Sequence, residues 1–141
     1  MRAPWHIWLV GIVSLLWNGM GAADYAMTQF EYAPYLAQFT DEQRAYFQSF
    51  PTWVQATWAL AVWLSVAGSI LLLARSRHAA MLFGVSLICM IATFVHNFGL
   101  AEVRMDQIAG TMALWFSILI LVVGFGLWIY ARQMNKRNVL E

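Results

Sequence analysis

Residues 79–100 read AAMLFGVSLICMIATFVHNFGL, a stretch without a single Asp, Glu, Lys or Arg. A hydrocarbon layer about 30 Å thick is crossed by roughly 20 apolar residues in a helix, and this stretch has that length. Similar stretches lie at about 5–27, 51–74 and 110–131. The sequence therefore predicts an all-α integral membrane protein, an antiparallel four-helix bundle that forms one transmembrane domain over residues 1–141.

The composition agrees with this class. The chain is 62% hydrophobic and 11% charged, whereas soluble domains are roughly 45–50% apolar and about 25% charged. The lipid bilayer is therefore the expected main partner. A net charge of +1 without clustered basic residues argues against a nucleic-acid partner.

Basic residues gather on one side of the predicted bundle, and such an excess is typical of cytoplasmic loops. This side carries six of them: Arg2, Arg75, Arg77, Arg132, Lys136 and Arg137. The other side carries two, Arg44 and Arg104. We therefore expect a multi-pass protein of the bacterial inner membrane with both termini in the cytoplasm and residues 28–50 outside.

The first apolar stretch has an alternative interpretation as a cleaved signal peptide, because residues 21–23 read GAA, a small-residue pattern found at cleavage sites. However, Arg2 is the only basic residue before the stretch, and three tryptophans interrupt it. We expect an uncleaved helix that begins close to Pro4, a residue suited to a first helical turn.

The external segment is too apolar for a solvated linker. Thr40 and Gln43 have capping-box spacing, which predicts a short helix from after Thr40 to about Ser49. Aromatic residues of this helix alternate with charged ones, as in helices that lie at the lipid–water interface. We expect a lid anchored by its aromatic side chains, in preference to a docking helix for a partner.

Polar side chains inside a membrane are costly and are a functional hypothesis by default. Five of them are expected near the external side of the bundle and define a candidate pocket: Asn18, Gln55, Thr93, His96 and Asn97. Asp24 and Tyr25 are expected at its outer rim. Asp24 lies about 100° from Asn18 around a helix of 3.6 residues per turn, so it faces another helix, reaches the surface or follows a break at Gly21. The alternative role for the five is interhelical hydrogen bonding, at roughly 0.6 kcal/mol each.

Helical spacing predicts which faces of the helices meet. The expected inward lines contain Ser86, Cys89, Thr93 and Asn97 on the third helix, and Gln55, Ala59, Val62, Val66 and Ser69 on the second. A line of small residues on the fourth helix favours close helix approach: Gly110, Ala113, Ser117 and Gly124.

Catalytic chemistry has little support in the sequence. It shows no Ser–His–Asp set, no metal-spaced Cys and His cluster and no glycine-rich phosphate loop. We therefore expect no enzyme activity, no catalytic residues, no metal and no cofactor. A haem held by two histidines is disfavoured because His6 and His78 belong to one side and His96 to the other, although a His–Met pair stays open. Cys89 is the only cysteine and is expected to be a buried apolar side chain.

Several strings carry a family resemblance: PWHIW at 4–8, WNGMG at 17–21, DYAMTQ at 24–29, FTDEQ at 39–43 and YFQSFP at 46–51. With these strings the chain resembles a family of small uncharacterised bacterial four-span inner-membrane proteins, some of which are labelled "sugar transporter". The similarity covers the first helix, the external segment and most of the second helix. It supplies no binding or catalytic residues.

Two functions follow as hypotheses. The first is a small-solute binding or transport component that uses the candidate pocket, with an unknown small-molecule ligand. The second is an accessory or assembly subunit of a larger membrane complex. Homo-oligomers and membrane-protein partners are compatible with both.

Overall fold

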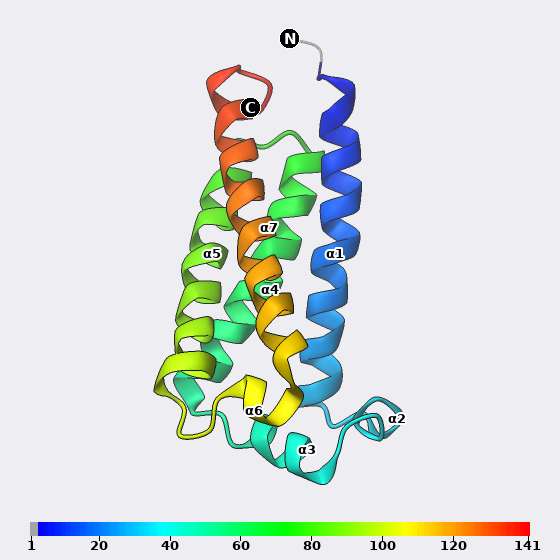
Figure 1. Ribbon diagram of the computed structural model, residues 1–141. Helices are drawn as coiled ribbons and strands as arrows, with labels where there is room; N and C mark the ends of the chain where they lie inside the picture. Colours follow the sequence, from blue (N-terminus) through cyan, green and yellow to red (C-terminus); the bar gives the residue numbers. More distant parts are fainter. Residues whose placement is uncertain (1–2) are drawn as a thin grey trace.

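The computed structural model describes residues 3–141, and every regular element in this range is helical (Figure 1). The elements are α1 (Trp5–Gln29), α2 (Ala33–Leu36), α3 (Asp41–Gln48), α4 (Thr52–Leu73), α5 (Ala79–Val95), the π-helical turn η1 (His96–Leu100), α6 (Met105–Ala109) and α7 (Thr111–Lys136). Helices α1, α4 and α7, and α5 continued by η1, are long and apolar enough to cross a membrane. The chain thus has the architecture of a multi-pass membrane protein, and the predicted four-helix bundle is confirmed.

The four long helices run side by side and alternate in direction (Figure 1). One end of the bundle holds both chain ends and the turn between α4 and α5, and we call it the termini end. The opposite end holds α2, α3, η1 and α6, and we call it the loop end. Predicted and observed boundaries differ little, the largest difference being five further residues of α7, which ends at Lys136.

Neighbouring helices approach closely where glycines face large side chains. A Cβ atom on Gly68 of α4 would lie 2.8 Å from the Phe83 ring of α5. One on Gly124 of α7 would lie 2.9 Å from the sulfur atom of Met90, also on α5. Small residues permit such contacts between transmembrane helices. Helix α5 therefore packs tightly on α4 on one side and on α7 on the other.

Helix α7 is the least buried of the four. Its buried residues all lie in the half nearer the termini end: Gly124, Leu127, Ala131 and Met134. Of the predicted line of small residues, only Gly124 is buried, whereas Gly110 is the exposed residue before the helix and has a φ of 90°. A Tyr130 hydroxyl 2.6 Å from Nδ1 of His6 joins α7 to α1.

The buried face of α4 differs from the predicted one. It contains Val54, Ala61, Ser65, Gly68, Ser69 and Leu72. Gln55, Ala59, Val62 and Val66 are only half-buried. The prediction was shifted because the mean hydropathy of α4 is high all round, so the sequence marks its polar residues but not its inward face. On α5 the predicted line is confirmed at Ser86, Cys89 and Asn97, all buried.

The segment after α7 folds back on the bundle. Val139 and Leu140 are buried in the core at the termini end, together with Ile7 and Leu72. The Nε atom of Arg75 donates a hydrogen bond to the carbonyl oxygen of Val139 (3.2 Å). These contacts join the last residues of the chain to the turn between α4 and α5.

Candidate functional site

Asn18 lies between α1 and α4 and belongs to a small polar cluster. Its amide nitrogen donates to the carbonyl oxygen of Ser65 (3.2 Å) and to the hydroxyl of Ser69 (3.0 Å). The Ser69 hydroxyl is also 2.8 Å from that of Ser14. All four residues are buried. This geometry is that of interhelical hydrogen bonding between the two helices.

Thr93 and Gln55 each make their own local contacts. The Thr93 hydroxyl lies 2.9 Å from the Thr57 hydroxyl and joins α5 to α4. The Gln55 side chain donates to the carbonyl oxygen of Phe50 (3.0 Å) and fixes the entry into α4. The candidate residues are thus distributed over separate contacts, and the structure brings only His96 and Asn97 into direct contact with each other.

His96 and Asn97 are buried because the backbone changes its winding there. The Ala101 amide donates to the His96 carbonyl oxygen (2.8 Å), a bond five residues long that defines the π-turn η1. Single π-turns within α-helices are frequent at functional sites. The extra residue per turn directs both side chains inward, where they are 8% and 7% exposed.

The hydrogen bond within this pair orients the imidazole. Nδ1 of His96 lies 3.0 Å from Oδ1 of Asn97, and an amide oxygen can only accept. Nδ1 therefore donates, and the neutral ring holds its lone pair on Nε2. The imidazole in this assignment offers Nε2 as a hydrogen-bond acceptor.

Aromatic rings flank the histidine. The centroids of Phe50 and Trp53 lie 5.7 and 5.5 Å from that of His96, both at nearly perpendicular angles. Phe50 also meets Tyr46 at 5.5 Å and Trp58 at 6.1 Å. Phe50 is itself buried, so this aromatic cluster forms an apolar wall beside the polar pair.

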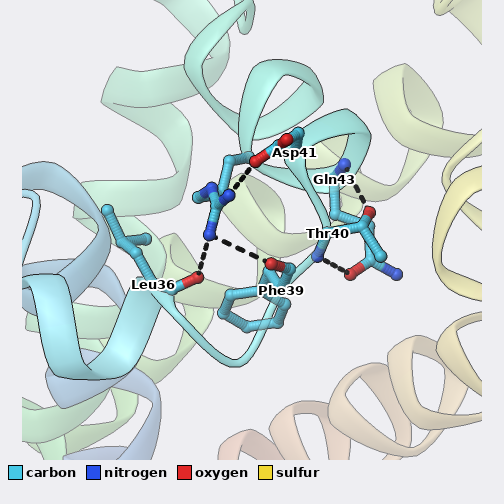
Figure 2. A network of polar contacts seen from close by, with 6 residues as sticks. Leu36, Phe39, Thr40, Asp41 and Gln43 are labelled. Atoms are coloured by element: carbon cyan, nitrogen blue, oxygen red, sulfur yellow. Dashed lines mark hydrogen bonds and ion pairs between the residues drawn. The ribbon is translucent and has the colours of Figure 1, made fainter.

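Helix α3 covers the loop end and is firmly capped (Figure 2). The Thr40 hydroxyl accepts from the Gln43 amide, and the Gln43 side chain accepts from the Thr40 amide, both at 3.1 Å. The predicted capping box is confirmed. Arg44 donates to the carbonyl oxygens of Leu36 and Phe39 and pairs with Asp41. These bonds hold the chain before α3 against the helix.

Helix α6 lies beside α3 and completes the cover. The Gln43 side chain donates to the carbonyl oxygen of Ile108 (3.2 Å). Arg104 and Asp106 form an ion pair (2.9 Å) at the start of α6. Helix α6 was not predicted, because residues 101–109 are too short and too polar to show a periodic pattern. We call α3 and α6 together the lid.

Tyr46 contributes a polar atom under the lid. Its hydroxyl oxygen is buried and has no hydrogen-bond partner among the described residues. Burial raises the pKa of this phenol, and the negative charge of Asp106 raises it further. A buried polar group without a partner asks for an explanation, and the sequence analysis had noted Tyr46 only as a lid aromatic.

Asp24 and Tyr25 lie at the loop end of α1, which continues through Gly21 without a break. Asp24 accepts a hydrogen bond from the hydroxyl of Tyr35 in α2. The Tyr25 ring meets the Trp58 ring of α4 at 4.9 Å. Burial, this hydrogen bond and the charge of Asp24 together raise the pKa of Tyr35. Of the three alternatives for Asp24, the structure thus shows contact with another helix.

Comparison with known proteins adds no name to this geometry. No family model, no curated protein and no solved structure matches the chain. Within residues 3–141, no group of three or more His, Cys, Asp or Glu side chains could hold a metal ion.

Proposed function

We propose that this protein binds a small neutral solute at the loop end, between the His96–Asn97 pair and the lid. The observation that carries the proposal is the Tyr46 hydroxyl, which is buried without a partner. A hydroxyl can donate and accept, and Nε2 of His96 can accept. A solute with hydroxyl groups would match both, beside the apolar wall of Phe50 and Trp53.

A neutral solute is favoured over an ion. The site contains two uncharged hydrogen-bonding side chains, and the lid's ion pairs satisfy Asp41 and Asp106 internally. The resemblance to proteins labelled "sugar transporter" supports the same class. Transport is a further step: transporters usually bind substrate near the membrane midplane, whereas this site lies at one end, so passage through the membrane would need an oligomer.

The setting that we propose is a bacterial inner membrane with both termini in the cytoplasm. The charges support it. At the termini end lie Arg75, Arg77, Arg132, Lys136 and Arg137, against Arg44 and Arg104 at the loop end. Because cytoplasmic loops are rich in such residues, the solute site would face the periplasm.

The experiment compares two substitutions in purified protein. Glucose, sucrose and glycerol are added separately, and thermal unfolding in detergent is measured. A ligand at 100 times its Kd stabilises by about 2.7 kcal/mol. His96→Leu should abolish this shift with little loss of intrinsic stability. Asn18→Leu is the control and should lose about 0.6 to 1.7 kcal/mol of stability while keeping the shift.

Two results would contradict the proposal. One is a shift that survives in His96→Leu, because binding would then lie elsewhere. The other is the absence of any shift with all three solutes in the wild-type protein.

An accessory subunit of a membrane complex is the second candidate. It is favoured by α7, which has no buried residue from Thr111 to Val123. Trp115 and Phe116 in this half are more than half exposed. A partner helix could cover this face in place of lipid. Extraction in mild detergent followed by particle mass measurement should then give a hetero-complex, and a particle of this chain alone would exclude it.

A further inference from the structure

Two hollows adjoin on the termini-end half of α5, and Met81 lines both. The first has a volume of about 360 Å³ and polar lining residues, Arg77, His78, Asn135 and Asn138. The second has a volume of about 350 Å³ and lies along the α5–α7 contact. We call them the head cavity and the tail groove. Together they lead from the end of the bundle into its apolar belt.

The head cavity offers both charge and an unused acceptor. Arg77 and His78 are exposed on the turn that precedes α5. Asn135 of α7 donates through its side chain to the carbonyl oxygen of Arg77 (3.2 Å). Its other polar atom, Oδ1, is buried and has no hydrogen-bond partner among the described residues. A ligand with an anionic group and a hydroxyl donor would satisfy both features.

The start of α5 adds to the attraction for an anion. No side chain caps this end, and its first turn contains no acidic residue. Exposed amide groups at a helix start carry a partial positive charge. The residues from 79 on therefore reinforce the field of Arg77 and His78.

The tail groove is almost wholly apolar and is floored by Gly84. Its walls include Val85, Ile88 and Trp128. A Cβ atom on Gly84 would lie 3.0 Å from Nε1 of Trp128, so glycine lets this ring lie flat against α5. The guanidinium of Arg132 lies 5.0 Å from the Trp128 ring centre, which places a cation at the mouth of the groove.

The charge of the whole end points the same way. Among the described residues, the termini end carries five basic side chains, at positions 75, 77, 132, 136 and 137, against one acidic side chain, Glu141. The remaining six acidic residues belong to the loop end. Basic pockets between transmembrane helices are known to bind anionic lipid head groups.

We propose that one anionic phospholipid binds here, with its phosphate beside Arg77 and His78 and an acyl chain in the tail groove. The continuity of a basic cavity with an apolar groove selects a phospholipid over a soluble phosphate compound, which would leave the groove empty. The hydroxyl groups of a glycerol head group would reach Asn135. The inference is independent of the solute site, which lies at the opposite end.

The test uses native mass spectrometry of the full chain in detergent, with equal amounts of phosphatidylglycerol and phosphatidylcholine added. The wild-type protein should retain one phosphatidylglycerol in preference to phosphatidylcholine. Arg77→Gln should weaken this binding about fivefold, the effect of one basic residue at a membrane surface. Arg104→Gln removes the same charge at the loop end and should leave the binding unchanged.

A second pair of variants tests the groove. Val85 and Val95 are both exposed residues of α5, but only Val85 lines the groove. Val85→Trp should fill it and weaken binding of phosphatidylglycerol, whereas Val95→Trp should not. Both variants must first match the wild-type protein in size-exclusion profile and thermal unfolding. If Val85→Trp disturbs folding, Val85→Phe takes its place.

Three outcomes would overturn the proposal. Equal retention of the two lipids would remove the role of charge. Equal behaviour of Arg77→Gln and Arg104→Gln would remove the head cavity. Displacement of the lipid by glycerol 3-phosphate at the same concentration, with no effect of Val85→Trp or Val85→Phe, would assign the cavity to a soluble phosphate compound.

Discussion

Tyr35 holds its proton more tightly than an ordinary tyrosine, because its hydroxyl is half-buried and donates to Asp24. Ionisation would place two negative charges side by side in a poorly solvated place. The bond joins α2 to α1 and so depends on a single protonation state.

This residue predicts how stability changes at alkaline pH. The folded protein keeps the Tyr35 proton above the ordinary tyrosine pKa of about 10, while the unfolded chain loses it there. The stabilisation is therefore fully present below pH of about 10 and is lost as pH rises through the raised pKa. Thermal unfolding measured from pH 8 to 12 should show a smaller loss above pH 10 in Tyr35→Phe than in the wild type. Tyr32→Phe, at an exposed neighbour, is the control, and an equal loss in both variants would contradict the prediction.

Residue identity alone located part of the candidate site. The sequence marks His96 and Asn97 as polar residues in an apolar stretch, and both are buried side by side. It could not show that Asn18 serves Ser65 and Ser69 instead, because that contact depends on the rotation of α4 about its axis. Helix α4 is apolar on nearly every face, so hydrophobic periodicity does not define this rotation.

At the scale of elements, the lid depends on the cap of α3. Thr40 and Gln43 satisfy each other's backbone amides at the start of this helix. Loss of a threonine cap costs about 1 kcal/mol. Helix α3 has eight residues, which is too short for stability without such help.

Thr40→Val should therefore loosen α3 without unfolding the bundle. Amide hydrogen exchange of residues 41–48 should become about fivefold faster, the equivalent of about 1 kcal/mol, while exchange in α4 and α5 stays unchanged. Thr52→Val, at the exposed first residue of α4, is the matched control. Unchanged exchange in Thr40→Val would show that packing on α6 and the aromatic cluster holds α3 in place.

Helix α3 was predictable because a capping box is a local signal, written in residues that are three positions apart. The π-turn η1 and helix α6 were not. A π-turn changes one hydrogen bond inside an otherwise ordinary apolar helix, and neither composition nor spacing records that change. Their positions follow from packing against α3 and α7, which only the folded chain defines.

At the scale of the whole molecule, the two ends of the bundle differ in charge and in proposed ligand. The orientation in the membrane is therefore the property on which both proposals meet. An anionic lipid at the termini end and a solute at the loop end require these ends to face opposite compartments.

The orientation can be tested with single cysteines in a Cys89→Ala background. Gln38→Cys lies in the loop-end segment and Ser76→Cys in the turn at the termini end. An impermeant thiol reagent added to intact cells should label only Gln38→Cys, and both variants should react once the membrane is permeabilised. Labelling of Ser76→Cys in intact cells would reverse the proposed topology.

The order of packing also bears on how the protein is made. Helices α1, α4, α5 and α7 each pack on the next one along the chain, joined by short turns or by the lid segment. A nascent chain leaving the ribosome can thus pair each helix with the one inserted before it, without waiting for a distant segment. Helix α7 emerges last and buries the least of its surface. Assembly would therefore finish with a helix that docks onto a preformed group of three, and slow insertion of α7 would leave the α5 surface, with its glycine-floored groove, open to lipid before the bundle closes.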